Sequence, residues 1–201
     1  MIVISAAVEG LVDETVIKML ISEAGAITGQ VYGKQGKPFL RESIGGYNNS
    51  ARFRPWVVLV DLDHDATCAP ELCQNWFRAK AGKLCFRVAV RAVEAWLLAD
   101  RESIAKFLSV SPSRIPADPE SESNPKHVMV DIAGRSKRRS IREDMVPRPE
   151  SGRSVGPAYT SRLIEFVQSS LWRPAIAAER SESLRRCRAC LKRLVEAEID
   201  S

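Results

Sequence analysis

The sequence predicts an α/β fold in which a mostly parallel sheet is flanked by helices and followed by a mainly helical C-terminal extension. In the first half, short aliphatic segments alternate with segments of helical spacing, whereas the second half has helical segments alone. Strands that alternate with helices form βαβ units, whose strands run parallel. The 201 residues, 45% of them hydrophobic, can form a core without disulfide bonds.

The predicted strands are short and rich in β-branched and aliphatic residues. This composition, bounded by polar residues, is typical of strands that are buried on both faces. We expect strands at residues 2–8, 26–32, 56–60 and 84–90.

The predicted helices show apolar residues at three- and four-residue spacing. A helix over residues 92–108 should break near Asp100, which would cap the segment that follows. Residues 33–55 are rich in Gly, Asn and basic residues and predict a loop around a short helix. The other helices are expected at residues 12–24, 70–81, 126–134, 159–171 and 181–197.

The pattern predicts three parts of the chain. Residues 1–108 should form the α/β core, and residues 159–201 a helical extension that packs on it. Residues 109–158 hold several prolines and serines and then a basic stretch poor in apolar residues, so we expect a mobile linker or surface excursion.

Charge is unevenly distributed along the sequence. Residues 1–100 hold 11 basic and 11 acidic side chains, and residues 101–201 hold 19 and 14. A basic second half favours a polyanion such as nucleic acid as partner, and the alternative is a set of solvated basic helices. Apolar runs are too short for a membrane span, and five cysteines without a framework pattern favour the cytoplasm.

Acidic side chains follow two of the predicted strands. Glu9 follows the first strand, and Asp61 and Asp63 follow the third, so all three should meet at the carboxyl edge of the sheet. Ionised carboxylates held together repel one another, and an all-oxygen set without histidine favours Mg²⁺ or Mn²⁺. Asp13 and Asp65 could extend the cluster. The alternative is that the aspartates cap a turn.

Glu94 is an acid within an otherwise apolar helical segment. Burial would raise its pKa unless a metal or an arginine neutralises it. It is either a further metal ligand or general base, or a partner of Arg91 at the edge of the helix.

Two clusters of basic residues could contact phosphates without reading sequence. The alternative is a solvated loop or a surface that docks an acidic partner. The candidate nucleic-acid-binding residues are Arg138, Arg139, Arg142, Arg185 and Arg186. Cys187 and Cys190 share one face of a helix with leucines, so packing is favoured over metal binding.

Three segments carry a resemblance to a known family. "VEGLVDE" (residues 8–14) followed by "VVLVDLD" (residues 57–63) resembles the TOPRIM domain of topoisomerases, bacterial primases, ribosomal-RNA maturases and OLD-type nucleases. "RVAVRAVEAWLLAD" (residues 87–100) resembles an uncharacterised TOPRIM-like family of prokaryotic proteins, whose members often occur beside ATPases in phage-defence clusters.

The resemblance implies a Rossmann-like TOPRIM core and a catalytic set of Glu9, Asp61 and Asp63. It implies a divalent-metal-dependent nuclease or phosphodiesterase acting on DNA or RNA, an anti-phage defence effector with an ATPase partner of the AAA or ABC type. Asp61 and Asp63, with Glu94, would hold one metal, and Glu9, with Asp13, would hold a second or serve as general base. The alternatives are a catalytically silent subunit that regulates an ATPase and a phosphohydrolase acting on small nucleotides.

Overall fold

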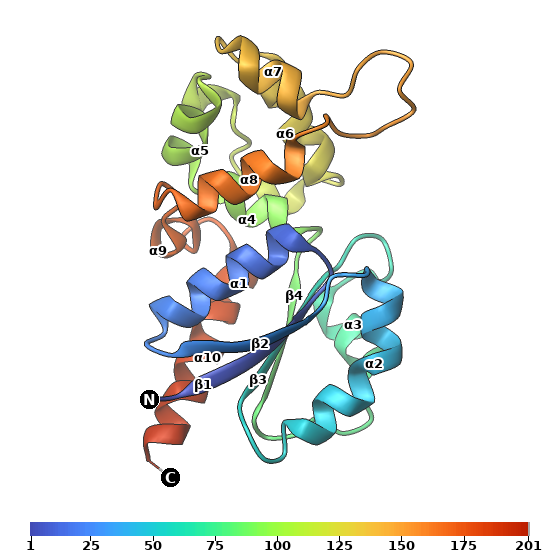
Figure 1. Cartoon of the computed structure of the whole chain (residues 1–201), viewed down its shortest axis with the longest axis vertical. Coiled ribbons are helices and arrows are strands. Elements are labelled where there is room, and N and C mark those ends of the chain that lie inside the picture. The colour runs from blue at the N-terminus through green and yellow to red at the C-terminus, as the bar shows by residue number, and fades with distance from the viewer. Residues whose placement is uncertain (201) are drawn as a thin grey trace. The chain divides into compact units, whose positions relative to one another are not determined.

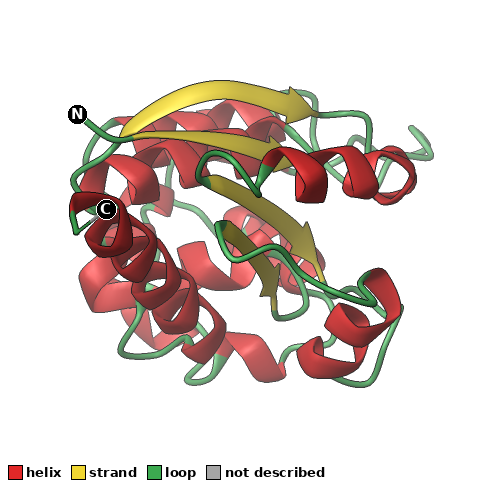
Figure 2. Cartoon of the chain, turned by 90° about the horizontal axis from the view of Figure 1, so that it is seen from below, coloured by secondary structure: helices red, strands yellow, loops and turns green. Residues whose placement is uncertain are grey.

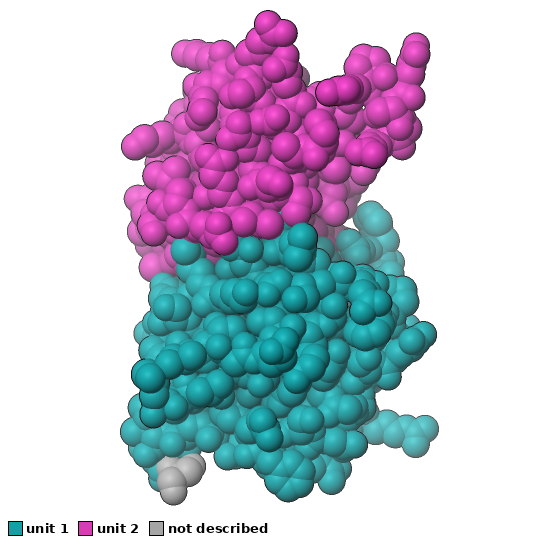
Figure 3. Space-filling view, viewed as in Figure 1, with its two compact units in different colours: residues 1–90, 183–201 teal, residues 91–182 magenta. Residues whose placement is uncertain are grey.

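The computed structural model describes residues 1–200, which form two compact units (Figure 3). Unit 1 comprises residues 1–90 together with the residues from 183 onward, and unit 2 comprises residues 91–182. The chain therefore leaves unit 1, builds unit 2 and then returns. Residues 91–108, which we expected in the α/β core, belong to unit 2, and the expected boundaries at residues 108 and 158 both lie within that unit.

Unit 1 is built on a four-stranded sheet with all strands parallel. Its strands are β1 (Val3–Val8), β2 (Ile27–Gly33), β3 (Trp56–Asp61) and β4 (Leu84–Ala89), in the order β2-β1-β3-β4. Most side chains of β1, β3 and β4 are buried, which explains why these strands are apolar without polar alternation. In the edge strand β2, Val31 alone is buried. The predicted α/β class with a parallel sheet is confirmed.

Helices cover both faces of this sheet (Figures 1 and 2). On one face lie α2 (Lys37–Ser50) and α3 (Ala69–Trp76), which pack against β3 and β4 through a buried apolar cluster. On the other lie α1 (Leu11–Glu23) and α10 (Glu182–Ile199). Side chains alternate along β4, so Phe86 joins the α2–α3 cluster while Cys85 faces α10.

Unit 2 is helical in the described chain. Its helices are α4 (Val93–Ala99), α5 (Arg101–Leu108), α6 (Pro125–Gly134), α7 (Arg139–Met145), α8 (Tyr159–Gln168) and α9 (Pro174–Ala177). Trp96, Phe166 and Trp172 are fully or almost fully buried in it, and Trp172 Nε1 donates a hydrogen bond to the Trp96 carbonyl.

Asp100 separates α4 from α5, as predicted. Its carboxylate accepts a hydrogen bond from Ser103 N and so caps α5. The same carboxylate, fully buried, accepts hydrogen bonds from the backbone and the guanidinium of Arg173. One aspartate thus ties the start of α5 to the start of α9.

Residues 109–158 are not the mobile linker that we expected. They contain α6, α7 and two 3-10 turns, Pro112–Arg114 and Pro119–Ser121. Apolar side chains of this segment, among them Ile115, Met129 and Ile141, are almost or fully buried. These few buried residues stabilise a segment whose composition is otherwise polar. None of the helices in residues 1–200 has the length and apolar character needed to cross a bilayer.

Candidate active site

The site lies where the strand order of unit 1 reverses. From β1 the chain goes outward to β2 on one side, and β3 and β4 then lie on the other side of β1. In open parallel sheets, ligands bind beyond the carboxyl ends of the two strands at such a switch point. Glu9 follows β1 directly, and Asp61 is the last residue of β3. The two strands therefore bring Glu9 and Asp61 to this point.

Glu9 is held against β3 by a backbone hydrogen bond. Its Oε1 accepts from Asp61 N at 2.8 Å, which joins the ends of the two strands. Burial raises the pKa of Glu9 to about 7, although the Asp61 N–H and the charge of Lys37 act against this rise. The nearby charges of Asp13 and Asp63 raise it further. Asp13 and Asp63 therefore each lie close enough to repel an ionised Glu9.

Asp13 lies in the first turn of α1 and is almost fully buried. A Cβ added at Gly10 would lie 3.1 Å from Asp13 Oδ2, so the carboxylate approaches the backbone that follows Glu9. A helix N-terminus also favours a carboxylate electrostatically. The structure thus places Asp13 next to the turn that carries Glu9, as its role in the predicted cluster requires.

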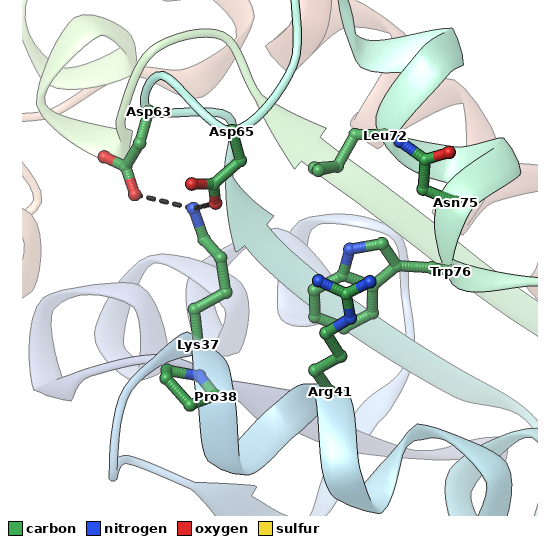
Figure 4. Close-up of a pocket in the computed structure, with 8 residues that line it drawn as sticks. All are labelled: Lys37, Pro38, Arg41, Asp63, Asp65, Leu72, Asn75 and Trp76. Atoms are coloured by element: carbon green, nitrogen blue, oxygen red, sulfur yellow. Dashed lines mark hydrogen bonds and ion pairs between the residues drawn. The ribbon is translucent and has the colours of Figure 1, made fainter.

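Lys37 neutralises two of the aspartates that follow β3 (Figure 4). Its Nζ lies 2.6 Å from Asp63 Oδ2 and 2.6 Å from Asp65 Oδ2. Burial acts to lower the pKa of Lys37, but the hydrogen bonds to both aspartates outweigh it, so the pKa is raised. The two aspartates are about half exposed, so each pair stabilises the fold only weakly.

Lys37 was not among the site residues that we predicted from the sequence. The residue is the first of α2, shortly after the end of β2, in a segment that we had expected to be a loop around a short helix. The signal was available, since any residue just beyond the end of a parallel strand lies at the same edge as Glu9 and Asp61.

The donor set suits a hard cation, although no metal geometry is assembled. Among residues 1–200, no group of three or more His, Cys, Asp or Glu side chains is arranged to hold a metal ion. The carboxylates of Asp13 and Asp63 nevertheless each act electrostatically on Glu9, and carboxylate oxygens are the ligands that Mg²⁺ and Mn²⁺ prefer. The residues present therefore fit such a cation in chemistry and in location.

Glu94 lies in unit 2, and the structure gives it partners there. It is buried in the first turn of α4 and accepts a hydrogen bond from Tyr159 Oη at 3.1 Å. Lys126 Nζ lies 3.9 Å from the same oxygen. Burial and the charge of Glu94 raise the pKa of Tyr159 well above its usual value. The buried carboxylate of Glu94 thus has a tyrosine and a lysine of its own unit as partners.

The candidate nucleic-acid-binding arginines are divided between the two units. Arg138 and Arg139 are exposed at the start of α7, where Arg139 pairs with Glu143 at 2.7 Å. Arg142 Nη1 donates to the Ser136 carbonyl. Arg185 and Arg186 are exposed on α10. The two clusters therefore belong to different compact units of the chain.

The basic excess is also shared by both units. Residues 91–182 hold 15 basic and 13 acidic side chains, and the remaining residues hold 15 and 12. The contrast between the two halves of the sequence disappears in the fold, because α10 brings its arginines back to the sheet.

Comparison with other proteins adds no family assignment. The chain matches no family model, and neither a curated protein nor a solved structure matches it. We therefore infer function from the residues of the site and their geometry.

Proposed function

We propose that the protein is a divalent-metal-dependent phosphodiesterase that acts on DNA or RNA. One observation carries the proposal: Glu9 and Asp61 meet at the switch point of a parallel sheet, with the charges of Asp13 and Asp63 acting on Glu9. This is the position at which such sheets bind phosphate-bearing ligands. A carboxylate cluster at that position favours a hard cation between the protein and a phosphate.

Each carboxylate has a role in the proposal. Asp61 and Asp63 would hold Mg²⁺ or Mn²⁺, and Glu9 with Asp13 would hold a second ion or accept the proton of the attacking water. When bound, the ions supply an activated water and neutralise the leaving oxygen. A pKa of about 7 suits Glu9 to proton transfer near neutral pH. The proposal does not need Glu94, which has partners in unit 2.

We also propose that unit 1 is a TOPRIM-like core and that the protein is an anti-phage effector with an ATPase partner. The placement of Glu9 after β1 and of Asp61 and Asp63 at the end of β3 supports the first part. The second part rests on the resemblance of residues 87–100 alone. Five free cysteines support a reducing, cytoplasmic location.

A catalytically silent subunit that regulates an ATPase is the second candidate. The observation in its favour is Lys37, whose ammonium group already neutralises Asp63 and Asp65 as a metal would. In this case the acidic edge of the sheet, formed by Glu9, Asp13, Asp61, Asp63 and Asp65, would be a structural ion-pair network. Metal binding separates the two candidates.

Metal binding should appear as thermal stabilisation. A cation at 100 times its dissociation constant adds about 2.7 kcal/mol to the free energy of unfolding, or roughly 5–10 °C in Tm. Calorimetry with and without Mg²⁺ or Mn²⁺ should show this rise in the wild type and much less of it in Asp61→Asn. An equal rise in both proteins would place the cation elsewhere.

Cleavage and binding should depend on different residues. Glu9→Gln and Asp61→Asn remove ligand charge but keep side-chain size, so cleavage should fall by at least 100-fold while binding is kept. Arg138→Ala combined with Arg139→Ala should weaken binding and lower its salt dependence by about one unit of log–log slope per lost phosphate contact. Gel-shift and nuclease assays on single- and double-stranded DNA and RNA, with each metal in turn, measure both effects.

Glu196→Gln is the matched control, because it removes an exposed carboxylate of α10 outside the acidic edge. It should cleave and bind as the wild type does. The assays are repeated with the ATPase encoded beside the gene, where there is one. If the wild-type protein neither binds nor cuts any of these substrates under both conditions, the silent subunit replaces the nuclease.

A further inference from the structure

A pocket opens directly beside the acidic edge of unit 1 (Figure 4). It has a volume of about 510 Å³ and lies between α2, α3 and the loop that follows β3. This volume is within the range of small-molecule sites. Its lining residues are Lys37, Pro38, Arg41, Asp63, Asp65, Leu72, Asn75 and Trp76.

One wall of the pocket is a fixed aromatic ring. Trp76 is only 8% exposed, and its ring packs against Phe86 of the core with the ring centroids 5.3 Å apart. Leu72, also buried, extends the apolar wall along α3. Because the core holds the Trp76 indole rigid, its small exposed part is a preformed surface for a flat apolar group. Trp76 would lose no side-chain freedom when such a group binds.

The rest of the lining is polar and suits a nucleotide. Asn75 is exposed and carries an amide that can both donate and accept hydrogen bonds, as the edge of a base requires. Arg41 is an exposed cation on α2, able to pair with a phosphate or to stack on a base. An aliphatic ligand would use neither group.

The pocket and the acidic edge share residues. Asp63, Asp65 and Lys37 line the pocket, and the same Asp63 acts electrostatically on Glu9 at the switch point. A group bound in the pocket therefore lies next to the proposed reaction site. A chain that continues from a base in the pocket would bring a neighbouring phosphate toward the acidic edge, where the proposed cation would bind.

We propose that this pocket receives one unpaired nucleotide of a single-stranded nucleic acid, with its base at Trp76 and Asn75 and its phosphate at Arg41. The inference rests on the proposed function for the identity of the substrate, and it narrows that substrate to single strands. In a duplex the bases are stacked and paired, so none of them can enter without being flipped out at a cost of a few kcal/mol.

The test measures binding apart from cleavage. Fluorescence anisotropy with end-labelled ten-nucleotide strands of DNA or RNA, in EDTA, should show single strands bound at least tenfold more tightly than a hairpin duplex at the same salt concentration. An abasic strand of the same length keeps the phosphates but lacks the bases, so it should bind roughly tenfold more weakly than the strand with bases.

Variants of exposed pocket residues assign the effect to the pocket. Asn75→Ala and Arg41→Ala should each weaken single-strand binding about three- to tenfold and leave hairpin binding unchanged. Trp76→Leu should weaken single-strand binding roughly tenfold. If this variant unfolds, the Asn75→Ala and Arg41→Ala variants still test the pocket. Arg52→Ala is the control, since it removes the same charge from an exposed position just beyond the end of α2 and outside the pocket.

The outcomes separate this inference from the proposed function. If abasic and normal strands bind equally, or if Arg41→Ala and Arg52→Ala have equal effects, only charge is involved and the pocket inference is overturned, even where cleavage occurs. If the pocket variants lower single-strand binding but no metal supports cleavage, the pocket inference stands and the phosphodiesterase proposal fails.

Discussion

At the scale of the residue, Glu9 ionises well above the ordinary range of a carboxyl group. It is partly buried at the end of β1, and its pKa of about 7 means that it ionises near neutral pH. In the unfolded chain the same carboxyl ionises near 4.5. Between these two values the folded protein binds the proton that the unfolded chain releases. Stability from this group is therefore fully present below pH 4.5 and is lost as the pH rises through 7.

Glu9→Gln should consequently stabilise the metal-free protein at alkaline pH. The amide keeps an oxygen for the Asp61 N–H but cannot ionise, so the free energy of unfolding at pH 8 should rise by about 1–3 kcal/mol, discounted for the exposed part of Glu9. Urea unfolding in EDTA at pH 4.5 and pH 8 measures the difference between variant and wild type. The difference should be close to zero at pH 4.5.

Glu196→Gln serves again as the control, because an exposed carboxylate should give no such pH-dependent gain. A gain of equal size at both pH values for Glu9→Gln would mean that shape, rather than ionisation, explains the effect. No gain at either pH would mean that Glu9 is ionised in the folded protein at little cost.

The site residues differ in how far sequence could predict them. Glu9 and Asp61 were predictable because each directly follows an apolar strand, and parallel strands end at one edge. The position of Lys37 at this edge could have been expected from its place just beyond β2, but its ion pairs with Asp63 and Asp65 depend on which strand lies beside which, and that order is a property of the whole sheet. Local patterns predict the edge of the sheet, whereas charge neutralisation depends on neighbours distant in sequence.

At the scale of the element, α2 shows why the sequence prediction of a short helix in a loop fell short. It runs for 14 residues through Gly45, Gly46, Asn48 and Asn49, which are poor helix formers. Tertiary packing stabilises it, because Leu40, Tyr47 and Ala51 are buried in the cluster beneath the sheet. Their spacing of seven and four residues is typical of one face of a helix. The glycines and asparagines between them had led us to expect a loop around a short helix instead.

The cysteines of β4 and α10 give a second test at this scale. Cys85 and Cys187 are buried thiols that lie close to Arg87, and burial raises the pKa of Cys187 to about 12. A neutral thiol in the core is a poor metal ligand. We therefore expect the protein, purified under reducing conditions, to contain no stoichiometric zinc.

Cys187→Ser should lower the free energy of unfolding by about 1–3 kcal/mol, because the hydroxyl is more polar and needs a hydrogen-bond partner in an apolar site. Cys187→Ala should cost less, since it introduces no polar atom, and Cys68→Ser at an exposed position should change stability by less than about 0.5 kcal/mol. Chemical denaturation and elemental analysis are the measurements. If the wild-type protein contains stoichiometric zinc and Cys187→Ser loses it, Cys187 binds a metal and the packing interpretation is wrong.

At the scale of the whole molecule, unit 2 is an insertion into unit 1. The chain leaves at Val90 and re-enters at Ser183, and Val90 N donates a hydrogen bond to Ser183 Oγ at 3.2 Å. The points at which the chain leaves and re-enters unit 1 therefore lie next to each other. Sequence did not predict this arrangement, because the helical segments from residue 92 onward look alike in pattern, and the pattern does not mark α10 as the one that packs in unit 1.

Removal of residues 91–182 should leave a folded α/β unit. A short Gly-Ser linker between Val90 and Ser183 can replace the insertion, because the distance to be closed is small and short loops cost little entropy. The shortened protein should show α/β circular dichroism and a cooperative thermal transition, and residues 91–182 alone should show a helical spectrum. A shortened protein that stays unfolded would mean that the sheet needs the insertion for its stability.

The same discontinuity has a consequence during synthesis on the ribosome. All four strands have been translated by residue 89, yet the helix that covers one face of β4 begins only at residue 182. At roughly 5–20 residues per second, the nascent sheet waits about 5–20 s for α10. In that interval the surface around Cys85 is open to chaperones and to other nascent chains, so it is here that the protein is most exposed to aggregation.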